Sequence, residues 1–182
     1  MTDVENDLSV VTNTVYDGAV SKGLKHGLGH YIMPNGDIFK GNFKNDLRHG
    51  TGTCKFKNGA IYKGEWRDGH PQGQGLLYCH PNEYVEGRFE GWKVSDGQVK
   101  LLFSNGELYS GNFKENSRNG VGVMYYSNGD IYEGEWEKDK RCKYSKLVMA
   151  DGSTFHAKFG EDKDNDVIYE VTFDDKDGNT FQ

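Results

Sequence analysis

The sequence has little of what marks several common protein classes. It holds three prolines and three cysteines among 182 residues. No apolar run approaches the roughly 20 residues that a membrane-spanning helix needs. The cysteines form no Cys-x-x-Cys pair and are odd in number, which favours a reduced, intracellular protein. Residues 1–15 have neither a basic cluster nor an apolar core, so we expect a tail there and no signal peptide.

A charge excess is also missing from most of the chain. Residues 1–150 hold 19 acidic and 19 basic side chains, whereas residues 151–182 hold 9 acidic and 3 basic ones. A neutral body with an acidic end is poorly suited to nucleic acid or to an anionic bilayer. We therefore expect no nucleic-acid partner, no membrane binding as the main task, and a cytoplasmic location.

Glycine and aromatic residues are abundant, and a 23-residue repeat organises both. The chain has 25 glycines and 13% aromatic residues, a composition typical of short strands and tight turns. Position one of the units is Tyr16, Phe39, Tyr62, Val85, Tyr109, Tyr132 and Phe155. Position three is glycine in the first six units, and position five is Val20, Phe43, Trp66, Phe89, Phe113, Trp136 and Phe159. Only the fourth unit carries an extra residue.

These columns predict a half-buried strand at the start of each unit. Side chains alternate along a strand, so positions one, three and five share one face, while positions two and four are almost all polar. Glycine between two rings leaves a gap into which neighbouring rings can lean. A second strand is expected to begin near Gly-x-Gly, as at Gly50 and Gly52, and to end at Asn-Gly, as at Asn58-Gly59. We expect a type I′ turn at Asn-Gly, with positive φ at both residues.

The predicted fold is therefore all-β: an elongated, twisted antiparallel β-meander built of one hairpin per unit. Its predicted parts are a tail over 1–15, repeats over 16–38, 39–61, 62–84, 85–108, 109–131 and 132–154, and a degenerate repeat with an acidic cap over 155–182. An atypical end unit is expected, because it must shield the stack from water.

These residues resemble the MORN repeat, whose pattern is roughly Tyr-x-Gly-x-Trp/Phe followed by Gly-x-Gly. The match is closest at Tyr62-x-Gly64-x-Trp66, and the resemblance covers about residues 16–154. It implies the same meander of hairpins. Family members include radial spoke head proteins, protist cytoskeletal proteins, junctophilins, plant phosphatidylinositol phosphate kinases and a histone lysine methyltransferase. In the enzymes the catalytic domain is a separate segment, and no such segment is evident here.

The sequence offers no catalytic, cofactor or metal site. His26 and His49 hold equivalent positions, but strand spacing places them about 10 Å apart, too far for one zinc ion. The segment Asp162–Asp166 lacks the glycine and glutamate of a calcium loop, so we interpret it as an acidic turn. A basic cluster in the degenerate turn of the sixth unit is either a solvated loop or a small patch for an acidic partner: Lys138, Lys140, Arg141, Lys143 and Lys146.

The aromatic face is the strongest candidate binding site. A single sheet has no second layer to cover its rings, and an exposed aromatic groove marks a partner surface. The predicted partner-binding residues are Phe39, Phe43, Tyr62, Trp66, Phe89, Tyr109, Phe113, Tyr132 and Trp136. Two interpretations stay open, since the rings either form only a core or form a core and a groove.

The function expected from the sequence is that of a non-catalytic scaffold that binds an extended segment or a helix of another protein. The resemblance implies a cytoskeletal setting, most plausibly the ciliary axoneme. The alternatives are a membrane- or phosphoinositide-associated regulatory module and the regulatory part of a larger enzyme.

Overall fold

The computed structural model describes residues 15–80, 82–159 and 168–182. These residues contain no helix, and their strands join in one 16-stranded antiparallel sheet. The strands are β1 (Val15–Ser21), β2 (Leu24–Ile32), β3 (Ile38–Lys44), β4 (Leu47–Lys55), β5 (Ile61–Arg67), β6 (His70–His80), β7 (Glu83–Glu90), β8 (Lys93–Val94), β9 (Gly97–Leu102), β10 (Leu108–Lys114), β11 (Ser117–Tyr125), β12 (Ile131–Glu137), β13 (Lys140–Val148), β14 (Thr154–Phe159), β15 (Ile168–Asp174) and β16 (Thr180–Phe181).

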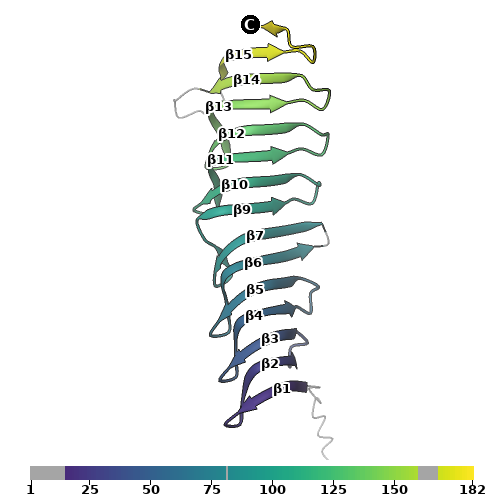
Figure 1. Ribbon diagram of the computed structural model, residues 1–182, viewed down its shortest axis with the longest axis vertical. Helices are drawn as coiled ribbons and strands as arrows, with labels where there is room; N and C mark the ends of the chain where they lie inside the picture. The colour runs from purple at the N-terminus through teal and green to yellow at the C-terminus, as the bar shows by residue number, and fades with distance from the viewer. Residues whose placement is uncertain (1–14, 81, 160–167) are drawn as a thin grey trace, which may run out of the picture.

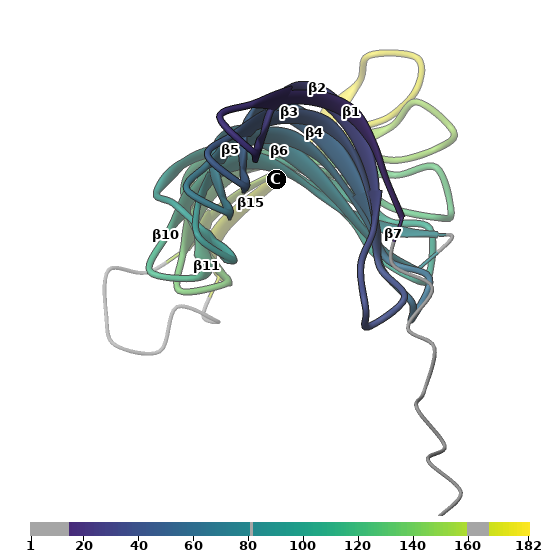
Figure 2. The same cartoon turned by 90° about the horizontal axis from the view of Figure 1, so that it is seen from below.

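The sheet is an open meander, as the sequence predicted. Each strand pairs with its neighbours in the chain, apart from β8, which pairs only with β7 beside the main path. The strands stack along a rod (Figure 1), and each curves along its length, so that the rod has an arched cross-section (Figure 2). Residues 1–14 of the predicted tail lie outside the described residues, and Val15 is already the first residue of β1.

Alternation along most first strands matches the prediction, but not along the edge strand β1, where Gly18 and Val20 are exposed. In β10, Tyr109, Gly111 and Phe113 are buried, while the residues between them are partly exposed. The buried side forms two hydrophobic clusters, one centred on repeats two to four and the other on repeats five and six. Val94 of the fourth repeat packs against both of them. The core is therefore a single aromatic layer on one face of the sheet, here called the aromatic face.

The turns at Asn-Gly differ from the prediction. At Asn35-Gly36 only the glycine has positive φ, at 87°. Asn35 instead accepts a hydrogen bond from the Asp37 amide through its side chain, and the Gly36 amide donates to the Met33 carbonyl. This is a longer loop with a left-handed glycine at its end, a common alternative to the two-residue hairpin. The prediction of a type I′ turn there was wrong.

Turns with two left-handed residues occur at the other end of most hairpins, whereas in the fourth repeat only Gly91 of the turn has positive φ. Asn45 and Asp46 have φ of 49° and 68°, and Lys138 and Asp139 have 49° and 67°. Two successive positive φ angles are the signature of the type I′ turn, which fits the twist of the flanking strands.

A β-bulge follows the position-three glycine in most hairpins. The register shifts between Gly41 and Phe43, between Gly64 and Trp66, and between Gly111 and Phe113. On the facing strand the first glycine of Gly-x-Gly is left-handed, as at Gly50 with φ of 66°. A bulge bends its strand and increases the local twist. Because it recurs in successive repeats, it accounts for the arch.

Glycines form a row across the sheet because the position-one rings lie on them. A Cβ added at Gly52 would come within 2.3 Å of the Phe39 ring, and one at Gly75 within 2.2 Å of the Tyr62 hydroxyl oxygen. The Tyr62 hydroxyl reaches past Gly64 and donates to the Glu65 carbonyl at 3.2 Å. The prediction that rings lean into the space left by glycine is confirmed.

The fourth repeat has neither the position-one ring nor the glycine on which that ring lies. Position one is Val85 instead of a ring, and the second glycine of Gly-x-Gly is Val99, which is 3% exposed. The shorter side chain at Val85 leaves volume that Val99 fills. The two departures from the pattern therefore compensate each other.

Carboxylates link several pairs of successive repeats, at one edge of the sheet or the other. Asp46 accepts the Lys25 amide at 2.9 Å, and Asp139 accepts the Arg118 amide at 3.0 Å. At the opposite edge Asp130 accepts the Ala150 amide at 2.9 Å. Donation from the backbone and side chain of Lys25 lowers the pKa of Asp46. Together with the ladder, these bonds hold successive hairpins in register.

Candidate functional site

The nine predicted binding residues form the buried layer of the aromatic face. Their exposed fractions run from 0% to 8%. The rings meet edge to face across successive repeats, with Phe39 and Trp66 centroids 5.3 Å apart and Tyr62 and Phe89 centroids 5.2 Å apart. Edge-to-face pairs add stability beyond area burial. The structure thus brings these residues together as core, and their part in partner binding stays a prediction.

Cationic side chains cover several of these rings. The Arg48 guanidinium lies 4.4 Å from the Trp66 ring centroid, and Arg118 lies 4.1 Å from that of Trp136. Both come from position ten, on the second strand of a hairpin. Arg118 is held there by Asp139, which accepts its Nε at 2.9 Å. The sequence analysis missed this column, although position ten repeats a cation as Lys25, Arg48, Arg118 and Arg141.

A half-exposed aromatic side chain lies over the middle of the aromatic face. Trp92, from the irregular fourth repeat, is 47% exposed. Its ring packs edge to face on Phe56, Tyr62 and Trp66, at centroid distances of 5.4, 5.8 and 5.9 Å. The extra residue of this repeat was seen in the sequence, but nothing in the repeat pattern indicated that Trp92 would lie over the neighbouring repeat.

A hollow of about 560 Å³ opens on the same face at repeats five and six. Its lining combines apolar side chains, including Met124, Trp136 and Phe159, with Arg118 and Arg141. The Arg141 guanidinium lies 4.6 Å from the Tyr132 centroid and donates to the Tyr126 hydroxyl. Apolar contact area beside stacked guanidinium groups is typical of the centre of a protein interface.

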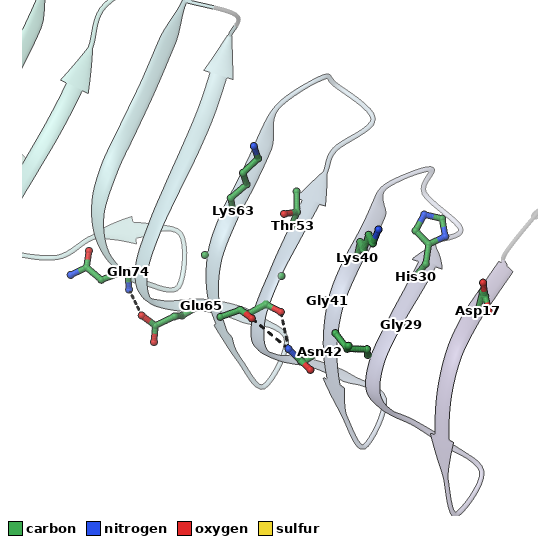
Figure 3. A pocket seen from close by; sticks show the side chains of 14 residues that line it. Asp17, Gly29, His30, Lys40, Gly41, Asn42, Thr53, Lys63, Glu65 and Gln74 are labelled. Atoms are coloured by element: carbon green, nitrogen blue, oxygen red, sulfur yellow. Dashed lines mark hydrogen bonds between the residues drawn. The ribbon is translucent and has the colours of Figure 1, made fainter.

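A larger hollow lies on the opposite face, here called the polar face. It has about 820 Å³ and crosses repeats one to three (Figure 3). The glycine row runs through it, and position-two and position-four side chains stand along it, among them Lys40, Asn42, Lys63 and Glu65. Asn42 donates to the Thr51 carbonyl at 3.3 Å, and Glu65 accepts the Gln74 amide at 2.9 Å. Sequence reasoning treated this face only as solvated.

The predicted basic cluster of the sixth repeat is divided by the fold. The sequence analysis placed it in a degenerate turn, but Lys140, Arg141, Lys143 and Lys146 lie on strand β13. Arg141 turns to the aromatic face, whereas Lys143 pairs with Glu135 at 2.7 Å and Lys146 faces Glu133 across the ladder. The prediction of a turn was wrong for these four residues, because β12 and β13 pair here despite the missing glycines, whereas Lys138 lies in the turn between the two strands.

The described residues show no arrangement suited to catalysis or metal binding. They contain no group of three or more histidine, cysteine or acidic side chains that could hold a metal ion. Burial raises the pKa of the Cys54 and Cys142 thiols, which disfavours the reactive thiolate. Burial also raises the pKa of Tyr62, Tyr109 and Tyr132 to about 12. The acidic segment Asp162–Asp166 lies outside the described residues.

Comparison with known proteins identifies the repeat. The sequence model of the MORN repeat matches residues 16–38, 39–61, 62–81, 109–131 and 132–142. These segments make up more than half of the chain and leave out the irregular fourth repeat. No match was found among curated proteins.

Two solved structures align with most or all of the chain. The first is the TCP domain of Drosophila melanogaster SAS-4 (dCPAP) in complex with a proline-rich motif of Ana2 (dSTIL). It is 15% identical, the alignment covers 100% of this chain and 96% of that chain, and the TM-score is 0.54. The second is the wild-type TCP10 domain of Danio rerio CPAP, 14% identical over 93% of each chain, with a TM-score of 0.29. The first likeness shows a shared fold.

Proposed function

The chain belongs to the MORN repeat family, and we propose that it is a non-catalytic scaffold that holds a segment of a partner protein against its aromatic face. The partner segment is extended or helical and lies across the repeats. The finer setting that we propose, a cytoskeletal assembly such as the ciliary axoneme, rests on the resemblance to radial spoke head and protist cytoskeletal proteins alone.

The observation that carries the proposal is the half-exposed Trp92 above a buried aromatic layer. Within the described residues no second layer of structure covers this face of the sheet. Trp92 presents an aromatic surface whose position is fixed by three rings beneath it. A rigid aromatic anchor of this kind is a typical binding hot spot. The predicted nine residues then act as the platform that holds Trp92 and the stacked guanidiniums in place.

Two further findings support the proposal. The hollow at repeats five and six gives the same face a second concave, partly apolar region. A protein of similar fold, the SAS-4 TCP domain, was solved with a proline-rich motif bound. Proline-rich segments are extended and dock on aromatic-lined grooves in other domains. An extended segment is therefore the favoured form of partner.

The test compares two half-exposed aromatic residues on opposite faces. Trp92→Ser removes the anchor, while Tyr144→Ser removes a 65% exposed ring that lies on the polar face opposite Lys158. Tagged wild-type and variant proteins are used for pull-downs from ciliated cells, with quantitative mass spectrometry. We expect a set of proteins that is lost, by about tenfold or more, with Trp92→Ser and retained with Tyr144→Ser.

Controls separate the proposal from its alternatives. Circular dichroism and thermal unfolding first establish that both variants are folded, because Trp92 also packs on the core. Equal loss with both variants, or loss with Tyr144→Ser alone, would contradict the aromatic-face scaffold. Robust co-sedimentation of the wild-type chain with anionic vesicles at physiological salt would favour a membrane-associated regulator. No helix among the described residues is long and apolar enough to span a bilayer.

A further inference from the structure

Lysine and histidine side chains form a line along the hollow of the polar face. His30 of β2 lies opposite Lys40 of β3, Lys40 lies opposite Thr53 of β4, and Thr53 lies opposite Lys63 of β5. Each member therefore stands one strand further along the rod than the one before it. All four line the 820 Å³ hollow, and Figure 3 shows them along one side of it.

The charges of Lys40 and Lys63 are not neutralised by carboxylates. Neither lysine forms an ion pair within the described part of the chain. Of the two acidic residues in the hollow, Glu65 is engaged by the Gln74 amide, and Asp17 lies at the outer end of the line, beside His30. Both lysines are exposed. The hollow thus holds two lysine charges that form no ion pair, Lys40 and Lys63, together with the carboxylates of Asp17 and Glu65 and with hydroxyl and amide groups beside them.

At the equivalent positions in the second half of the sheet, basic side chains lie beside acidic ones. Glu86 and Lys100 form an ion pair at 3.3 Å, and Glu133 faces Lys146 across the ladder. Alternating charges in those repeats neutralise each other, as is common on a solvated sheet face. Only repeats two and three place two lysines in succession at position two. This contrast distinguishes the hollow from the rest of the polar face.

We propose that the hollow binds an acidic, extended peptide segment, independently of the aromatic face. Lys40 and Lys63 are two strands apart, about 10 Å at the usual strand spacing. In the extended polyproline II conformation a chain advances about 3.1 Å per residue with three residues per turn, so carboxylates at i and i+3 lie on one side, about 9.3 Å apart, and match the two lysines. Thr53, between the lysines, supplies a hydroxyl for the peptide backbone. The matching ligand is therefore an extended segment with acidic residues at i and i+3, running along the rod.

A peptide fits this surface better than a polyanion does. Two lysines and one histidine are too few to hold a nucleic-acid backbone, where several phosphates are neutralised together. The whole chain carries a formal charge of −6, and residues 151–182 hold 9 acidic side chains against 3 basic ones. This negative charge repels a long polyanion or an anionic bilayer. A short acidic segment in the hollow encounters little of it.

Fluorescein-labelled ten-residue peptides provide the test. Each contains two glutamates at spacings from i+2 to i+5 in a Ser/Thr background, and a matched peptide has both glutamates replaced by glutamine. Fluorescence anisotropy with the full chain at low salt is expected to show saturable binding that is strongest at i+3, absent with glutamine and weakened by added salt. We expect Lys40→Glu combined with Lys63→Glu to reduce the affinity by about tenfold or more.

Matched variants decide between the possible outcomes. Lys100→Glu combined with Lys146→Glu makes the same charge change in the second half of the column and is expected to leave i+3 binding within about twofold. Trp92→Ser is expected to leave it unchanged, so that this proposal and the aromatic-face scaffold fail separately. The proposal is overturned if no glutamate peptide binds above its glutamine match. It is also overturned if both lysine pairs weaken binding equally, or if only single-stranded RNA or phosphatidylserine vesicles bind.

Discussion

The two faces of this sheet are built from the same strands, yet they do different work. On the aromatic face, residues such as Tyr62 and Trp66 are 0% and 2% exposed and fixed by ring contacts and hydrogen bonds. On the polar face their neighbours Lys63 and Glu65 are exposed. A one-residue step along the strand therefore separates a buried side chain that holds the fold from an exposed one that contributes little to the core. The difference teaches that the polar face can be changed with little effect on stability, whereas the aromatic face cannot.

The largest test of this comparison removes one ring and, separately, its neighbour. Tyr62→Ala is expected to lower the free energy of unfolding by about 3–5 kcal/mol, because it leaves a cavity between Trp66 and Phe89. Lys63→Ala is expected to change it by less than about 0.5 kcal/mol. Urea denaturation measures both. Similar losses for the two variants would show that the faces do not divide the work in this way.

A smaller effect is expected when the glycine row is filled. Gly75→Val places methyl groups where the Tyr62 ring lies, and overpacking of this kind costs about 1–3 kcal/mol. The fourth repeat carries valine at both equivalent positions, Val85 and Val99. The double variant Tyr62→Val with Gly75→Val should therefore be more stable than the sum of the two single changes predicts. Additive losses in a double-mutant cycle would rule out this compensation.

Alkaline pH should act on the aromatic face through its tyrosines. The pKa of Tyr62, Tyr109 and Tyr132 is about 12 in the folded chain, against 10 for an ordinary tyrosine. The folded state holds these protons longer, so their contribution is complete below pH 10 and is lost as the pH rises from 10 to 12. Each contributes on the order of 2 kcal/mol at most. Tyr109→Phe should reduce the slope of unfolding free energy against pH in that window by about one third, and an unchanged slope would contradict the assignment.

The smallest expected effect concerns a carboxylate that links two repeats at the edge of the sheet. Asp46→Gly removes the acceptor for the Lys25 amide without straining the turn, since the equivalent positions 23 and 69 are glycine. We expect a small loss of thermal stability, because the bond is charge-assisted but exposed. Asp46→Asn keeps an acceptor oxygen and should recover part of it. If Asp46→Gly unfolds like the wild type in a thermal melt, the carboxylate does not help to hold the repeats together.

The sequence by itself determined the architecture. The positions that recur every 23 residues show which side of the first strands is buried. Side chains alternate along a strand with a period of two, and the buried side is the one rich in aromatic residues. The glycine row was also predictable from Gly41, Gly52 and their equivalents, since only a missing side chain lets a ring lie flat on a strand. Left-handed residues at position eight were visible for the same local reason. The choice of turn type at Asn-Gly was not, because the register of the bulge decides which residues need positive φ.

Only the tertiary structure decided how the repeats use one another. Arg48 covers a ring of the following repeat, and Trp92 covers rings of the preceding one, through contacts that depend on the twist between hairpins. The hollow of the polar face likewise arises from the bending of strands at successive bulges. As a result Lys40 and Lys63, which are ordinary surface residues in the sequence, line the same hollow. The periodic sequence determines which side chains each repeat carries, but the angle between repeats determines which of these side chains come into contact.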